Sequence, residues 1–211
     1  MLLALITLGL VLITRGRALW LVVLMPALAV AALLHERVGA QRERDELLSA
    51  ALSDPLTGLD NRRSFLVRAD YEIVRHLRDR RSFALVMIDL DGFKALNDRF
   101  GHDAGDELLC DVADALISGL RAQDTVARLG GDEFCVLAPQ TDRVGSPPLA
   151  AHITRAVAQA SAGVEAVRAS VGIALFPQDG RSVEELMRAA DQRLFVAKRA
   201  RRGAARERRA A

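Results

Sequence analysis

The sequence is poor in aromatic residues and cysteine and carries almost no excess of charge. Phe, Trp and Tyr make up 4% of the 211 residues, and the formal net charge is +2. So small a charge gives no reason to expect a nucleic-acid partner. Cys110 and Cys135 lie in apolar segments without the spacing of metal ligands, so we expect two buried free thiols in a reducing compartment.

Two widespread binding motifs are also absent. The sequence contains no G-x-x-x-x-G-K-[ST], which excludes a P-loop nucleotide site. Segment 89–92 has the Asp-x-Asp-Gly pattern of an EF-hand, but Phe93 and Phe100 stand where that loop needs oxygen ligands. An EF-hand calcium site is therefore excluded, and any metal or phosphate must be bound in another way.

The hydrophobic excess, 51% of all residues, is concentrated before residue 35. Met1 to Thr14 and Ala18 to Leu34 carry no charge, and the second run has the roughly 17–25 residues that one membrane span needs. The arginines of segment 37–44 favour a cytoplasmic side after this run, although Arg15 and Arg17 weaken that asymmetry. We expect one or two transmembrane helices in residues 1–34; a signal peptide or a fragment of a longer membrane protein are the alternatives for the short first run.

Residues 35–53 are charged and helix-prone, which predicts a linker helix that is either solvated or a stalk pairing two chains. The turn-rich segment 54–63 ends this linker, and Asp60 or Asn61 can cap the next helix. That helix is expected to bury apolar side chains at spacings of three and four, namely Phe65, Leu66, Ala69, Ile73 and Leu77. A domain of about 150 residues then has room to follow.

Phe83 to Leu90 is a short apolar run that predicts a buried strand, and it ends in the carboxylates of Asp89 and Asp91. An Asp directly after such a run needs a cation as its partner. Residues 126–129 and 134–137 predict two further strands, joined by a tight turn with positive φ at Gly130-Gly131. Bare glycines followed by Asp132 and Glu133 suit a phosphate with Mg²⁺, although an ordinary acidic turn has the same composition.

Gly130-Gly131-Asp132-Glu133-Phe134 resembles the signature of the GGDEF family, the diguanylate cyclases of bacteria. Further matches extend the resemblance from about residue 54 to residue 202. The order of helices and strands predicts an α+β fold with one antiparallel sheet covered on one face. By resemblance, this is the ferredoxin-like palm of nucleotidyl cyclases and polymerases.

The resemblance implies a role for each residue of the signature and of the first acidic cluster. Asp89 and Asp132, with the backbone carbonyl of Leu90, would hold Mg²⁺ or Mn²⁺. Glu133 would act as a further metal ligand or as a base, beside the bare turn of Gly130 and Gly131.

Substrate-binding residues are also implied by resemblance. Lys94, Lys198 and Arg202 match basic positions that contact phosphate, but Arg201 and Gly203 stand where the family usually has Gly and then Asn or Asp. Asn97 and Asp106 match the residues that bind guanine, and we expect them on a polar loop over residues 96–106. From the residues alone, a helix cap is the favoured role of Asp106.

Arg121 and Asp124 form an R-x-x-D that ends five residues before the signature. This spacing matches the family's inhibitory site for its product, cyclic di-GMP. A loop with both side chains in solvent is the alternative.

We therefore expect a membrane segment at residues 1–34, a linker at 35–53, a cyclase domain at 54–203 and a basic tail at 204–211. The resemblance implies condensation of two GTP into cyclic di-GMP with release of pyrophosphate, by a homodimer at the bacterial inner membrane with its catalytic domain in the cytoplasm. The alternatives are a non-catalytic module that binds GTP or cyclic di-GMP, and a membrane anchor without nucleotide.

Overall fold

The computed structural model describes residues 6–7, 9, 27–39, 51–163 and 167–210. The chain divides into two compact units, Met1–Ser49 and Ala50–Ala211. The second unit contains the whole sheet and all of the predicted site residues.

The first unit contains a described helix over residues 27–39. Within the described part of the chain, no helix is both long and apolar enough to cross a bilayer. This finding contradicts the expected inner-membrane localisation, and the expected transmembrane helices are not supported. Most of the first apolar run, the beginning of the second and most of the linker at 35–53 lie outside the described residues.

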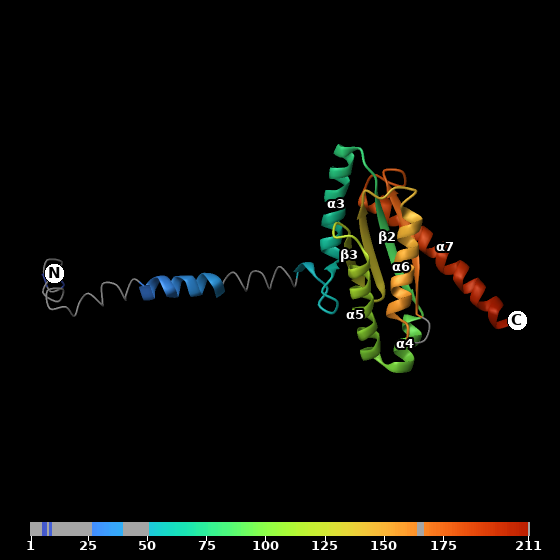
Figure 1. Ribbon diagram of the computed structural model, residues 1–211, viewed down its shortest axis with the longest axis horizontal. Helices are drawn as coiled ribbons and strands as arrows, with labels where there is room; N and C mark the ends of the chain where they lie inside the picture. The colour runs from blue at the N-terminus through green and yellow to red at the C-terminus, as the bar shows by residue number, and fades with distance from the viewer. Residues whose placement is uncertain (1–5, 8, 10–26, 40–50, 164–166, 211) are drawn as a thin grey trace. The chain divides into compact units, whose positions relative to one another are not determined.

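The second unit contains both helices and strands, interspersed along the chain (Figure 1). Its elements are β1 (Asp60–Asn61), α3 (Arg62–Asp79), β2 (Phe83–Asp91), α4 (Phe93–Phe100), α5 (His102–Gly119), β3 (Thr125–Gly130), β4 (Glu133–Pro139), α6 (Ser146–Ala160), β5 (Arg168–Phe176) and α7 (Val183–Ala210). The predicted strands at 83–90, 126–129 and 134–137 are therefore confirmed, with small extensions at their ends.

The strands form one five-stranded sheet in the order β1-β3-β4-β2-β5. β2 pairs antiparallel with β4 and β5, and β3 pairs antiparallel with β4, but β1 pairs parallel with β3. The sheet is thus mixed, and the expectation of a purely antiparallel sheet was wrong. The error concerns the edge strand β1, because a strand of two residues has no sequence periodicity from which its direction could be predicted.

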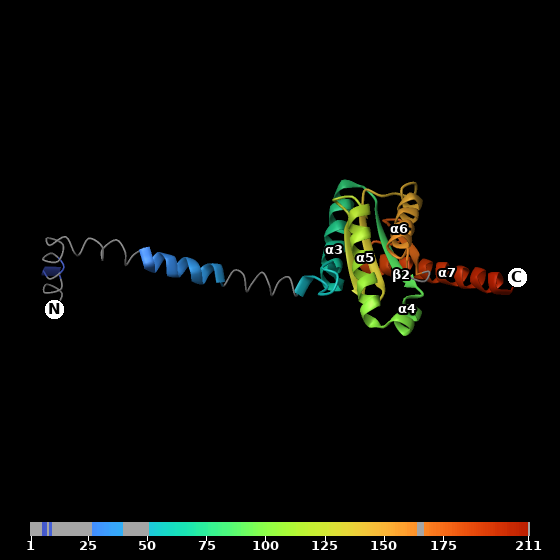
Figure 2. The same ribbon diagram turned by 60° about the horizontal axis from the view of Figure 1, so that its bottom comes forward.

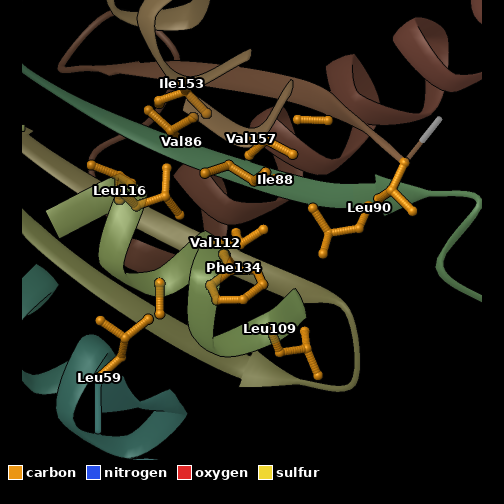
Figure 3. Close-up of a cluster of buried hydrophobic side chains, with 14 of the residues drawn as sticks. Leu59, Val86, Ile88, Leu90, Leu109, Val112, Leu116, Phe134, Ile153 and Val157 are labelled. Carbon is orange, nitrogen blue, oxygen red and sulfur yellow. The ribbon is translucent and has the colours of Figure 1, made fainter. Parts of the chain in front are cut away.

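Helices cover both faces of the sheet, so the prediction of a single covered face was also wrong. Packed on one face, α5 and α6 enclose a core with Val86, Ile88 and Phe134 (Figure 3). On the other face α3 and α7 enclose a second core with Phe83 and Leu85. β2 is buried from Phe83 to Leu90, since successive side chains alternate between two filled cores.

The first long helix, α3, begins as predicted but buries a different stripe. The side chain of Asn61 caps it by accepting from the Ser64 N–H at 3.1 Å. Phe65 and Ala69 are buried, whereas Leu77 is exposed and His76 is buried in its place. The His76 ring packs edge-on against Phe83 at the far end of β2 from the acidic cluster.

The last helix, α7, starts after Ser182, whose hydroxyl accepts from the Glu185 N–H at 3.2 Å. This confirms the predicted N-cap. The helix packs closely on β5, since a Cβ added at Gly172 would lie 2.1 Å from the Ala190 carbonyl oxygen. It continues through most of the expected basic tail to Ala210 and extends beyond the sheet (Figure 2).

Candidate functional site

The predicted acidic residues meet where β2 ends and β4 begins. Antiparallel pairing aligns Asp89 with Glu133, so the end of β2 lies beside the tip of the β3–β4 hairpin. The Leu90 N–H donates to the Asp132 carbonyl oxygen at 3.3 Å. Asp89 is buried, whereas Asp132 and Glu133 are half-buried. Residues from two separate parts of the sequence thus form one cluster.

The charges of this cluster act on one another. Burial raises the pKa of Asp132, and the negative charges of Asp89 and Asp91 raise it further, while Lys198 opposes the shift. The Asp132 carboxylate therefore lies close enough to Asp89 and Asp91 to be repelled by both. A bound cation would relieve this repulsion, because it favours the ionised form of every carboxylate around it.

The donor set fits a hard divalent cation. Carboxylate and backbone carbonyl oxygens are the ligands that Mg²⁺ prefers, and the set predicted from sequence consists of Asp89, Asp132 and the Leu90 carbonyl. Lys198 already places an ammonium nitrogen 2.6 Å from Asp89 Oδ2, so the protein itself puts a cation at this carboxylate. Over the described ranges, no three His, Cys, Asp or Glu side chains are grouped to hold a metal by themselves.

The glycine turn has the predicted backbone. Gly130 has φ 142° and Gly131 has φ 57°, and both are exposed, so bare main chain lies next to Asp132. Glu133 and Lys198 together line a depression of about 440 Å³ beside this turn, with Phe195 of α7 on its wall.

Arg128 holds the turn in place, a role that the sequence reading did not assign. Its Nε and one terminal nitrogen donate to the Gly131 carbonyl oxygen at 3.0 and 2.9 Å, and the other terminal nitrogen lies 2.9 Å from Asp54 Oδ1. Burial raises the pKa of the Asp54 carboxyl group, but hydrogen bonds from Thr57 and Arg128 lower this pKa by more, so the net shift is downward. An arginine two residues before a Gly-Gly turn was the available signal.

The predicted basic residues lie at different places. Lys198 contacts Asp89, as described above, whereas Lys94 is exposed near the start of α4. Arg202 belongs to α7, but its side chain is outside the described part of the structure. Of the two basic side chains that the structure describes, Lys198 contacts the acidic cluster and Lys94 is exposed.

The predicted guanine-binding residues, Asn97 and Asp106, lie on two helices rather than on the expected loop. α4 and α5 are separated by Gly101 alone, so the loop expected at 96–106 was wrong. Asp106 stands one turn inside α5, and the residue at the N-cap is Gly101, which excludes the capping role for Asp106. The exposed Asp106 lines a depression of about 480 Å³ with Leu56 and Cys110.

Asn97 is held tightly between these helices. A Cβ added at Gly105 would lie 1.9 Å from Asn97 Oδ1, so the glycine makes room for this amide. Asn97 Oδ1 is buried, and no hydrogen-bond partner for it occurs in the described part of the chain. A buried amide oxygen without a partner is costly, and a ligand that donates a hydrogen bond to Asn97 Oδ1 would remove this cost.

The predicted inhibitory pair forms a closed turn at the opposite end of β3. The Arg121 N–H donates to Asp124 Oδ2 at 3.0 Å, and the Asp124 N–H donates to the Arg121 carbonyl oxygen at 2.9 Å. Burial raises the pKa of Asp124, opposed by this hydrogen bond and the charge of Arg121. Asp124 Oδ1 is buried and unpaired within the described residues, while the Arg121 side chain is exposed. The length of β3, about 20 Å at roughly 3.3 Å per residue, separates this turn from Gly130.

Comparison with known proteins identifies the region that carries these features. Residues 51–204 match the family described as "Diguanylate cyclase, GGDEF domain". The chain is 43% identical over 160 residues to the bifunctional diguanylate cyclase/cyclic di-GMP phosphodiesterase MucR of Pseudomonas aeruginosa, a match that covers 74% of this chain and 23% of MucR. It is 36% identical over 167 residues to the diguanylate cyclase DgcM of Escherichia coli, covering 79% of this chain and 40% of DgcM.

A solved structure is similar as well. The GGDEF domain of DgcB from Caulobacter crescentus, in complex with c-di-GMP, superposes with a TM-score of 0.63 at 26% identity. This match covers 71% of the present chain and 89% of that domain. The curated relatives are longer proteins, since the chain spans less than half of MucR or DgcM.

Proposed function

The chain belongs to the GGDEF family of diguanylate cyclase domains, and we propose that it condenses two molecules of GTP into cyclic di-GMP with release of pyrophosphate. The observation that carries the proposal is the acidic cluster, in which Asp89 and Asp132 meet beside a bare glycine turn. Relatives named as diguanylate cyclases support the same reaction.

Asp89, Asp132 and the Leu90 carbonyl are proposed to hold Mg²⁺ or Mn²⁺. When bound, the ion would supply charge neutralisation and orientation of the triphosphate. The protein's own contributions are proposed to be positioning and charge. The exposed backbone at Gly130 and Gly131 admits the phosphates. Glu133 supplies a further ligand or a base, and Lys94, Lys198 and Arg202 contact phosphate oxygens.

Asn97 and Asp106 are proposed to select guanine. The Watson–Crick edge of guanine shows N1–H and N2–H₂ donors next to the O6 acceptor, so a carboxylate with an amide nearby matches it. Adenine lacks this donor pair. Placement of the two residues on adjacent helices supports the assignment.

One active site cannot complete the reaction, because each half of the symmetric product requires its own GTP. We therefore propose that two copies of domain 54–203, which lies within the compact unit Ala50–Ala211, face each other as a homodimer. The linker at 35–53 is proposed to join the domain to the rest of the protein, and the residues after 203 to continue α7 as a basic tail.

Incubation of the full chain with GTP and Mg²⁺ tests the function directly. We expect cyclic di-GMP and pyrophosphate, identified by mass spectrometry and by a pyrophosphate assay, with no product when ATP replaces GTP or when EDTA is added. If GTP binds but remains unchanged over hours at high protein concentration, the chain is instead a non-catalytic module of the same fold.

Feedback by the product provides an independent prediction at Arg121 and Asp124. An exposed guanidinium can bind phosphate or stack on guanine, and the unpaired Asp124 Oδ1 can accept from the guanine edge. Replacing Arg121 by Ala should leave the initial rate within about twofold of the wild type, since β3 separates this turn from the acidic cluster. Added cyclic di-GMP should then no longer slow the reaction.

The measurement is a set of progress curves with and without added cyclic di-GMP for the wild type, Arg121→Ala and the control Arg155→Ala, an exposed arginine on α6. Equal inhibition of all three proteins would show that the turn is an ordinary solvated connection.

A further inference from the structure

Two cations on α7 face the carboxylates at the end of β2. Lys198 Nζ lies 2.6 Å from Asp89 Oδ2, and one turn later an Arg201 terminal nitrogen lies 4.0 Å from Asp91 Oδ2. Residues three apart on a helix share one face, so both side chains extend from α7 towards the same cluster. The sequence reading assigned no role to Arg201 or Asp91.

The two contacts differ in strength. Lys198 is held at a short distance and its side chain is 27% exposed, whereas the contact of Arg201 is at the limit of an ion pair and its side chain is 38% exposed. Asp91 already has a closer partner, because Ser170 Oγ donates to the same Oδ2 atom at 2.5 Å. The guanidinium of Arg201 is therefore near the cluster without being tightly bound by it.

This arrangement favours an anionic ligand that carries several charges. A guanidinium presents planar pairs of N–H donors that match phosphate oxygens, and a phosphate competes well against a carboxylate that already accepts from Ser170. A triphosphate entering here meets the negative charges of Asp89, Asp91 and Asp132, and Arg201 adds a second cation on the same face of α7 as Lys198.

We propose that Arg201 is a further substrate-binding residue, which contacts the polyphosphate of the bound nucleotide and makes the site prefer a triphosphate over a monophosphate. This inference rests on the proposed nucleotide site at Asp89 and Asp132. It concerns a residue at which the chain departs from the pattern that it resembles. If position 201 were Gly, Lys198 would be the only remaining member of this pair of cations on α7.

The test compares nucleotide binding by the full-length wild type with binding by three variants. The ligands are 3′-deoxy-GTP, which lacks the hydroxyl needed for condensation and so reports binding alone, and GMP, which lacks the β- and γ-phosphates. Affinities are measured by calorimetry in the presence of Mg²⁺ for Arg201→Ala, Arg201→Lys and Arg199→Ala. Arg199 is the matched control, because it lies over the Phe195 ring, 5.7 Å from its centroid, and not at the carboxylates.

Arg201→Ala should bind 3′-deoxy-GTP about 10-fold more weakly, while its affinity for GMP stays within about twofold of the wild type. Arg201→Lys should lose less, since it keeps the charge but not the paired donors. Arg199→Ala should match the wild type. The preference for triphosphate over monophosphate is the readout that a purely structural role for Arg201 would not change.

The proposal is overturned if Arg201→Ala keeps the wild-type preference, if both ligands weaken equally, or if the wild type itself does not prefer the triphosphate. If instead the proposed function is wrong, the experiments give a different result. A wild type that prefers 3′-deoxy-GTP through Arg201 but forms no cyclic di-GMP from GTP would retain the phosphate contact and lose the cyclase assignment.

Discussion

Replacing Asp132 by Asn should reduce the rate of cyclic di-GMP formation by at least about 100-fold, which is the scale of losing one preorganised electrostatic group at an active site. The half-buried carboxylate lies within electrostatic range of Asp89 and Asp91, and an amide of nearly the same shape cannot supply its charge. Asp89→Asn should give a loss of the same order.

The assay is the initial rate of product formation at saturating Mg²⁺, with the melting temperature measured for each variant. Asp70→Asn is the control, because Asp70 is exposed on α3 and lies outside the proposed site. Asp89 also pairs with Lys198, so its replacement can change stability as well, and the rate must be compared for folded protein only. Wild-type rates in either folded variant would refute the proposed metal-binding carboxylates.

Replacing Asp106 by Ala should weaken GTP binding by about 1–3 kcal/mol, because guanine donors would lose their acceptor. The preference for GTP over ATP should narrow by a corresponding factor, since ATP binding does not depend on this carboxylate. Asp106 is exposed and does not cap α5, so we expect the helix and the fold to remain intact.

The check is a competition of GTP and ATP for the wild type, Asp106→Ala and Asp114→Ala. Asp114 is an exposed aspartate on the same helix, but it does not line the depression that contains Asp106. Undiminished discrimination in Asp106→Ala would mean that guanine is selected elsewhere.

The local parts of the site could be predicted because short-range rules determine them. A Gly-Gly pair between two apolar runs predicts a hairpin from backbone conformation alone, and Gly130 and Gly131 indeed have positive φ. The caps Asn61 and Ser182 likewise depend on a side chain and an N–H three residues later.

Some predictions were wrong although the sequence contained the relevant pattern, because each segment was interpreted without its surroundings. The run Phe83 to Leu90 is apolar at every position, which indicates a strand buried on both faces, yet only one covered face was expected. Segment 96–106 looked like a loop because it is polar, but exposed helices are polar on their outer faces, and a single Gly101 suffices to separate α4 from α5.

By itself, the sequence determined the family, the main strands and the residues that the acidic hairpin presents, because these depend on neighbours within a few positions. Only the tertiary structure decided which distant charges meet: Lys198 with Asp89, Arg201 with Asp91, and Arg128 with Asp54, 74 residues away. It also decided that helices cover both faces of the sheet. These contacts depend on how α7 and the opening turn pack on the sheet, and packing is set by the whole core at once.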